Sequence, residues 1–319
     1  MRFGVNTAPR GLMVSREAYM TTAQSAERLG YDFLSVSDHV VVPRANDSDY
    51  PYAEDAKWTG GASGFSIEML TALTFLVGCT ERIKLLSSVM VVPHRPALLT
   101  AKMLASMDLL SNGRMRVGVG AGWLREEFEA LETRPFDARG KVTDEFIEAM
   151  KVLWTQDAPS YAGEHVRFSN VVFLPKPIQK PHPPIWVGGE SAPALRRTVK
   201  LGDVWYPGAG NPKWRLDTPE RLKSRVAKLH EFAEKENRDP ASIAIAYLWF
   251  NPVSFEAQPG HDTARRMFSG RAEDMVADVA ALKEVGVSHI NLTFGGETTA
   301  DMQHTMQRFA DEVMPLVGS

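Results

Sequence analysis

The stretch RLGYDFLSVSDH, residues 28–39, contains the pattern that decides the fold. Its first residues end a helical pattern, Gly30 makes a turn, and residues 33–37, with the strand formers Phe33, Leu34 and Val36, then form a short strand. A glycine directly after a helix is a common C-cap. The same order of helix end, glycine and strand occurs in EVGVSHI, residues 284–290. Helix, glycine and buried strand in this order predict a repeating α/β fold.

Eight such units follow one another along the chain. The predicted strands are short and apolar on both faces, as buried parallel strands are. They cover residues 2–7, 33–37, 83–91, 114–120, 184–188, 203–207, 243–250 and 289–294. Helical patterns cover residues 15–29, 68–79, 96–110, 140–155, 191–201, 218–237, 271–285 and 299–316. Eight strands, each followed by a helix, predict a (β/α)8 TIM barrel, and we expect residues 1–319 to form one domain.

The charge and hydropathy of the chain argue against several classes of partner. Lys and Arg number 36, Asp and Glu number 39, and the formal net charge is −3. Because phosphate binding needs clustered Lys and Arg, we expect no nucleic-acid partner. No segment approaches the roughly 20 apolar residues of a membrane span, so we expect no membrane association. MRFGVNTA, residues 1–8, starts with a strand rather than a signal peptide, which favours a cytoplasmic protein.

Three segments are longer than the connections of a regular barrel. Residues 40–67 follow the second strand, residues 157–183 form a proline-rich insertion before the fifth strand, and residues 251–270 follow the seventh. The first and third leave the C-terminal ends of strands, where barrel enzymes hold their active sites. The aromatic residues of the first are Tyr50, Tyr52 and Trp58. They favour an active-site lid over disorder.

Asp38 and His39 lie at the C-terminal end of the second strand, directly after apolar residues. Histidine changes its charge near neutral pH and often acts as a general acid or base. The pattern therefore favours a catalytic His39, with Asp38 holding the local backbone or the imidazole. The alternative is structural: Asp38 caps a turn and His39 bonds a backbone carbonyl.

Small residues interrupt the third and fourth strands. Ser87 and Ser88 stand in an apolar run, where their hydroxyl groups or backbone meet a ligand or merely pack. The alternating glycines of the fourth strand are Gly118, Gly120 and Gly122. They permit close approach of another group to the backbone, or simply barrel packing. The dinucleotide-binding fingerprint is absent, because Trp123 stands where its third glycine should fall.

The fifth strand ends in PPIWVGGESAPALRR, residues 183–197. Two glycines follow the strand, and Ser191 then caps a helix whose first turn contains Pro193. Exposed N–H groups at such a turn bind anions, although a plain glycine turn with a serine cap is the alternative. Tyr206 and Gly208 follow the sixth strand, next to this turn.

Two common hydrolase classes lose support from missing motifs. The chain contains no HExxH, no CxxC and no GxSxG motif. A metal-dependent barrel hydrolase would need a cluster of ligands, and the single pair Asp38-His39 offers too few. We therefore expect no metal.

The sequence resembles the bacterial luciferase-like monooxygenase superfamily over nearly its whole length, most closely the branch of oxidoreductases that use the deazaflavin coenzyme F-420. The matching segments are MRFGVNTA (1–8), SVSDHVVVP (35–43), MDLLSNGRMRVGVGAGW (107–123), RGKVTDEFIEAMKVLW (139–154), PKPIQKPHPPIWVGG (175–189) and RRTVKLGDVWYPG (196–208). The resemblance implies a modified barrel with an insertion before strand 5, a small organic substrate, and a tendency to form homodimers.

The resemblance also assigns residues. His39 matches the active-site histidine of deazaflavin sugar-phosphate dehydrogenases, and Ser87-Ser88 matches a strand-3 bulge that often contains a non-prolyl cis peptide. The residues expected at the cofactor are Asp38, Ser87, Ser88, Gly120, Ala121, Gly122, Trp123, Gly188, Gly189, Glu190, Ser191, Tyr206 and Gly208. Gly188, Gly189 and Ser191 match the turn that grips the phosphate. Those dehydrogenases have Glu where this chain has Trp123, which argues against sugar-phosphate oxidation.

Two cofactors and two functions stay open at this point. Other branches of the superfamily use reduced FMN with oxygen, whereas the carbon at position 5 of a deazaflavin makes it mainly a hydride carrier. The sequence does not choose between FMN and F-420. The favoured function is a flavin- or deazaflavin-dependent oxidoreductase, and the alternative is a non-catalytic flavin-binding protein.

Overall fold

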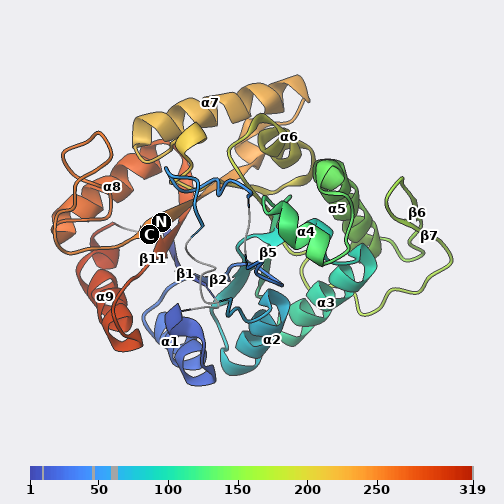
Figure 1. Ribbon diagram of the computed structural model, residues 1–319, viewed down its shortest axis with the longest axis horizontal. Coiled ribbons are helices and arrows are strands. Elements are labelled where there is room, and N and C mark those ends of the chain that lie inside the picture. Colours follow the sequence, from blue (N-terminus) through green and yellow to red (C-terminus); the bar gives the residue numbers. More distant parts are fainter. Residues whose placement is uncertain (9–10, 45–46, 59–63, 318–319) are drawn as a thin grey trace.

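The computed structural model describes residues 1–8, 11–44, 47–58 and 64–317 of the chain. Its centre is a barrel of parallel strands (Figure 1). The barrel strands are β1 (Arg2–Thr7), β2 (Phe33–Val36), β3 (Lys84–Ser87), β5 (Met115–Gly120), β8 (Ile185–Gly188), β9 (Val204–Tyr206), β10 (Ala244–Pro252) and β11 (Val287–Thr293). Each pairs with the next in this order, β1 pairs with β11, and pairing of β3 with β5 closes the ring. The predicted TIM barrel is confirmed.

Helices surround this barrel (Figure 1). They are α1 (Arg16–Arg28), α2 (Met69–Cys79), α3 (Ala97–Leu110), α4 (Arg125–Ala130), α5 (Arg139–Thr155), α6 (Ala192–Leu201), α7 (Pro219–Lys235), α8 (Ala272–Glu284) and α9 (Thr299–Glu312). Short 3-10 helices are η1 (Gly11–Met13), η3 (Val92–His94), η4 (Phe136–Ala138), η5 (Pro212–Trp214), η6 (Pro240–Ser242) and η7 (Met314–Leu316). Within the described ranges, none of these helices is long and apolar enough to cross a bilayer.

Local sequence explains where the helices begin and end. Side-chain oxygens at N-cap positions accept hydrogen bonds from the first turn of five helices, which satisfies N–H groups that the helix itself cannot pair. These N-caps are Ser15, Glu68, Ser191, Thr218 and Thr298. Gly30 and Gly286 follow α1 and α8 with φ of +83° and +97°, a conformation that other residues rarely adopt. The glycines that the sequence pattern placed after helices, Gly30 and Gly286, therefore do lie at helix ends.

The third strand departs from its prediction. It divides into β3 and β4 (Met90–Val91), and the Ser88–Val89 peptide between them is cis, as the resemblance implied. A Cβ atom on Gly118 would overlap the carbonyl oxygen of Ser87. The glycines of the neighbouring strand therefore make room for this bulge of the chain itself.

A β-hairpin and a short helix were not predicted from the sequence. The antiparallel strands β6 (Tyr161–Ala162) and β7 (Arg167–Phe168) form a hairpin in the segment before β8, beyond the ring of helices (Figure 1). The short helix α4 follows β5. The predicted lid, residues 40–67, contains residues 45–46 and 59–63, which lie outside the described part of the chain.

The barrel interior is filled by side chains. Its buried cluster consists of Phe33, Leu86, Trp186, Val204, Tyr206, Ala246 and Leu248. Each large apolar side chain buried in this way contributes roughly 1.5–3 kcal/mol to stability. Because the interior is packed rather than open, a ligand site belongs at the rim formed by the C-terminal ends of the strands.

Candidate active site

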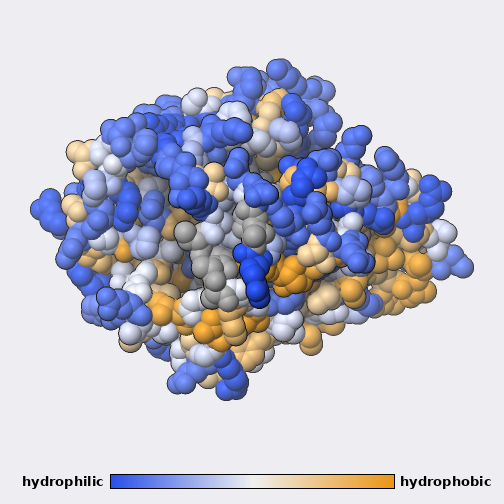
Figure 2. All heavy atoms as spheres, viewed as in Figure 1, coloured by the Kyte–Doolittle hydropathy of each residue, from blue (hydrophilic) through white to orange (hydrophobic). Residues whose placement is uncertain are grey.

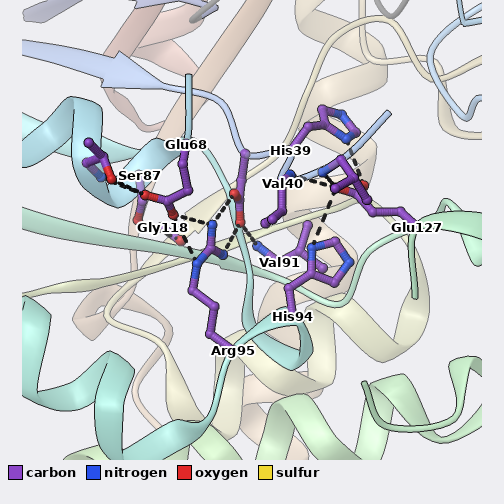
Figure 3. Close-up of polar contacts among 12 residues, drawn as sticks. His39, Val40, Glu68, Ser87, Val91, His94, Arg95, Gly118 and Glu127 are labelled. Atoms are coloured by element: carbon purple, nitrogen blue, oxygen red, sulfur yellow. Dashed lines mark hydrogen bonds and ion pairs between the residues drawn. The ribbon is translucent and has the colours of Figure 1, made fainter. Parts of the chain in front are cut away.

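His39 lies three residues beyond the end of β2 and has a carboxylate behind it. Its Nδ1 lies 2.8 Å from Oε2 of Glu127, on α4 (Figure 3). The other oxygen of Glu127 accepts hydrogen bonds from the N–H groups of Val40, at 2.7 Å, and Val41, at 3.2 Å. Only 11% of the His39 side chain and 1% of the Glu127 side chain are exposed. The imidazole is therefore held by a buried carboxylate from another element.

A second histidine lies on the far side of the same carboxylate. His94 Nδ1 is 4.0 Å from Oε1 of Glu127, and its ring packs edge-on against Phe128 at 4.7 Å (Figure 3). Within the described part of the chain, neither ring nitrogen of His94 has a hydrogen-bond partner. Burial lowers the pKa of His94, because desolvation disfavours the imidazolium form more than nearby Glu127 and Asp38 favour it.

Asp38 faces away from the imidazole. Its carboxylate accepts the N–H of Val91 at 2.8 Å and a bidentate pair of hydrogen bonds from Arg95, both at 2.8 Å. Arg95 also pairs with Glu68 at 2.6 Å, and these two carboxylates hold the pKa of the guanidinium above its usual value despite the opposing effect of burial. Of the two roles proposed for Asp38, the structure supports holding the backbone, while Glu127 holds the imidazole.

Aromatic rings of the segment after β2 cover His39. Trp58 packs against the imidazole with ring centroids 4.3 Å apart and planes 30° from parallel. Trp123, which follows β5, meets Trp58 edge-on at 5.6 Å and Tyr50 at 5.1 Å. Tyr50 in turn contacts Tyr52 at 5.8 Å. The three aromatic residues predicted for the lid therefore form one cluster, and Trp58 brings this cluster into contact with the candidate catalytic histidine.

A polar chain runs from Ser88 into the barrel. Its hydroxyl lies 2.9 Å from that of Tyr206, to which the amide of Asn291 donates at 2.6 Å. Asn291 also donates to Ser35 at 2.8 Å. Burial raises the pKa of Tyr206 to about 12, so the phenol stays protonated and able to donate. Ser87 instead donates to the carbonyl of Gly118 at 2.8 Å and is fully buried, which supports packing at this position.

The residues from Gly120 to Trp123 form the rim next to this bulge. A Cβ atom on Gly120 would lie 2.7 Å from the side chain of Val89, and one on Gly122, at φ +85°, would lie 2.7 Å from that of Val91. Both glycines are therefore required by packing within the chain. Ala121, Gly122 and Trp123 are partly exposed at the rim.

The turn after β8 combines a serine cap with a buried acid. Ser191 caps α6 by accepting from Ala194 at 3.4 Å, and Gly189 has φ of +105°. The Glu190 carboxylate points inward and accepts from Gly208 N–H at 2.7 Å and Asn211 at 2.9 Å. Burial raises the pKa of this carboxyl group, an effect that the hydrogen bonds partly oppose. Glu190 thus ties the turn to the loop after β9 with its side chain.

Sequence reasoning missed the residues that support the rim. Glu127 stands in REEFEAL, residues 125–131, four positions after Trp123, and its carboxylate reaches a residue 88 positions away along the chain. Three glutamates lie close together in this segment, at 126, 127 and 129, and nothing in the sequence distinguishes Glu127 from the other two. The sequence did not indicate Arg95 and Glu68 either, because Arg95 pairs with Asp38 and with Glu68 only when the chain is folded.

Among the described residues, no group of three or more His, Cys, Asp or Glu side chains is placed to hold a metal ion. His39, Asp38 and Glu190 each pair with other side chains of the protein.

Comparison with known proteins shows which family the chain belongs to. A family model described as luciferase-like monooxygenase matches residues 1–310. The chain belongs to the luciferase-like monooxygenase family. It is 35% identical over 232 residues to an uncharacterized protein of Mycobacterium tuberculosis, which covers 72% of this chain and 76% of that protein.

Two further proteins bear on the chemistry of this luciferase-like barrel. An FMNH2-dependent dimethylsulfone monooxygenase of Pseudomonas fluorescens is 33% identical over 316 residues, with 86% of this chain and 84% of that protein covered. A solved F-420-dependent secondary alcohol dehydrogenase superposes with a TM-score of 0.75 at 19% identity, over 100% of this chain and 99% of that one. At that identity the likeness shows the fold alone.

The family confirms the fold, the resemblance and the class of function predicted from the sequence. Luciferase-like proteins include FMN monooxygenases and F-420 oxidoreductases, so the chain is an oxidoreductase of this type. Both cofactors named from the sequence occur among its relatives and structural neighbours, and neither is preferred.

Proposed function

We propose that this luciferase-like barrel binds reduced FMN or reduced F-420 at its C-terminal rim and oxidises or reduces a small organic molecule beside His39. The observation that carries the proposal is the position of His39: a partly exposed imidazole at the end of β2, anchored by buried Glu127 and covered by Trp58. A catalytic acid or base needs such a fixed, shielded imidazole.

The rim has features that fit the flat ring system of such a cofactor. The Ser88–Val89 bulge and the glycines at 120 and 122 form a low wall, and Trp123 borders it. Bound there, a flavin or deazaflavin supplies two-electron chemistry. The chain would contribute Ser88 and Tyr206 as hydroxyl groups behind the ring, and His39 as the group that holds or moves a proton.

The turn after β8 fits a phosphate. Gly188, Gly189 and Ser191 are partly exposed at the beginning of α6, whose first turn contains no acidic residue. Positive charge is close by, because Arg225 donates through Nε to the carbonyl of Glu190 at 2.7 Å. Backbone N–H groups at a helix N-terminus attract anions. We propose this turn as the phosphate site, with the Glu190 side chain as its internal support.

The segment from residue 40 to 67 is proposed as the lid. Glu126 accepts from the N–H of Asp47 at 2.7 Å and from the hydroxyl of Ser48 at 2.7 Å, which fastens the segment to α4. Its aromatic rings already contact His39 and Trp123. Shielding of this kind excludes water from reactive groups.

We also propose that the protein forms a homodimer through α3 and the segment before β8. Helix α3, ALLTAKMLASMDLL, is apolar around most of its circumference, which is typical of a helix buried on more than one side. Leu110 is 69% exposed and Val172 86% exposed, and Leu99 and Leu174 are exposed too. Apolar residues gather along the lower right edge of Figure 2, where Figure 1 places this region. Sedimentation of the wild type and of Leu110→Glu tests the dimer. The expected cytoplasmic location stays a prediction.

Turnover of a reduced cofactor tests the proposed function. The purified protein is loaded anaerobically with reduced FMN or reduced F-420 and mixed with candidate small organic substrates or oxygen, while cofactor absorbance is recorded. We expect one cofactor to be oxidised faster with protein and substrate than with either alone. Tight binding without any accelerated oxidation would favour the alternative, a non-catalytic flavin-binding protein.

A further inference from the structure

The pairing of His39 with Glu127 supports an inference that rests on the proposed function and deepens it. We infer that Glu127 is a positioning residue: it fixes the proton of His39 on Nδ1, directs Nε2 toward the substrate, and stabilises the ring when Nε2 takes up a proton. No sequence motif pointed to this residue.

The geometry decides which nitrogen carries the proton. A carboxylate oxygen can only accept, so the 2.8 Å contact between His39 Nδ1 and Glu127 Oε2 requires an N–H on Nδ1. The second oxygen of Glu127 is already occupied by the N–H groups of Val40 and Val41. The carboxylate is therefore fixed at both oxygens, and Nε2 of the neutral imidazole is left as the acceptor (Figure 3).

The neighbouring groups leave His39 as the main partner for the negative charge of Glu127. The titratable groups that face this carboxylate are His39 and His94, and the charges of Asp38 and Arg95 act on His94. Asp38 and Arg95 form a bidentate pair with each other. Burial keeps His94 neutral, because it lowers the pKa of that imidazole. His39 is thus the cation that Glu127 balances when a proton arrives.

The proton step follows from this arrangement. Nε2 of His39 accepts a proton from a substrate O–H or N–H group, the bond to that oxygen or nitrogen breaks, and the imidazolium remains paired with Glu127. In the reverse direction the same proton returns. A carboxylate behind a histidine raises its basicity and fixes its tautomer.

The test measures His39 itself and needs no substrate. Histidine 15N–1H NMR of the wild-type protein, with His39→Gln to assign the signal, should show the Nδ1–H tautomer. In Glu127→Gln the N–H groups of Val40 and Val41 should keep the amide oxygen, so that the amide NH2 faces Nδ1 and the tautomer shifts toward Nε2–H. Glu129→Gln, an exposed position on the same helix, is the matched control and should leave the tautomer unchanged.

Activity measurements then test the positioning role of Glu127 separately from the proposed function. In Glu127→Gln we expect kcat to fall by about 10-fold or more with cofactor affinity unchanged, and Glu127→Asp should restore part of the activity. An Nε2–H tautomer in the wild type, or an unchanged His39 tautomer in folded Glu127→Gln, would overturn the inference. Should Glu127→Gln fail to fold, the wild-type tautomer still decides. The expected Nδ1–H tautomer of His39 in a protein that binds neither cofactor would overturn the proposed function and leave the His39–Glu127 pairing intact.

Discussion

The hydroxyl of Tyr52 lies 3.3 Å from Oε1 of Glu190 and donates a hydrogen bond to it. Tyr52 belongs to the proposed lid, and Glu190 belongs to the turn proposed to hold the cofactor phosphate. Burial raises the pKa of Tyr52 well above its usual value, and the nearby Glu190 carboxylate adds to this effect, so the phenol remains a donor. The lid and the turn are thereby joined at a buried acid.

Removal of this hydrogen bond should loosen the lid. In Tyr52→Phe we expect hydrogen exchange in residues 47–58 to accelerate by roughly five- to tenfold, because one lost hydrogen bond to a buried acid is worth about 1 kcal/mol. Tyr161→Phe removes a comparable bond, to Glu148 at 2.7 Å in the β6–β7 hairpin, and should leave residues 47–58 unchanged. Equal exchange in both variants and the wild type would show that Tyr52 does not hold the lid.

Loss of the imidazole should affect chemistry more than binding. In His39→Ala we expect turnover to fall by about 100-fold, the usual contribution of a general acid or base, with cofactor affinity within about threefold of the wild type. His39→Asn should retain more activity if hydrogen bonding is the main role. His304→Ala, on the exposed face of α9, is the control. Steady-state kinetics with wild-type turnover in His39→Ala would reduce His39 to a structural residue.

His289 should make stability fall in acid. It lies on β11 at the opposite end of the barrel from the rim, 5.1 Å from the ring of Trp186. Burial, helped by the cations Arg2, Lys84 and Arg116 and opposed by Asp32, lowers its pKa to about 4. The folded state therefore favours the neutral ring, and this contribution is present above about pH 6.5 and is lost as the pH falls toward 4.

The measurement is the free energy of unfolding in denaturant at several pH values. The shift corresponds to a loss on the order of 3 kcal/mol across that window. In His289→Gln the decline between pH 6.5 and 4 should be smaller by about this amount, whereas His304→Gln should keep the wild-type slope. An unchanged slope in His289→Gln would mean that other groups cause the acid sensitivity.

The barrel was predictable because its signals are local. Helix caps such as Ser191, the glycines after helices, and two-sided apolar strands each act within a few residues, and the barrel order follows from their alternation. The strand ends then indicated His39 and the Gly188–Ser191 turn, since parallel strands direct their C-terminal ends to one rim.

The support of the site was not predictable, because it depends on contacts between distant segments. Glu127 and His39 are 88 residues apart, and Arg95 and Asp38 are 57 apart. The glycines of β5 illustrate the other difficulty: their pattern indicated close approach by some group, and the structure shows that at Gly118 this group is the backbone of Ser87. Pattern alone cannot tell an internal neighbour from a ligand.

Cofactor binding at the turn after β8 tests the central claim most directly. FMN and F-420, oxidised and reduced, are titrated into the wild type and into Gly189→Ala and Gly286→Ala. Both glycines have positive φ, +105° and +97°, so the two variants carry comparable backbone strain, and only the first lies at the proposed phosphate site. We predict that the wild type binds at least one cofactor and that Gly189→Ala weakens its binding by about tenfold or more, with Gly286→Ala unchanged. Equal affinity in all three proteins, or binding of neither cofactor by the wild type, would contradict the account.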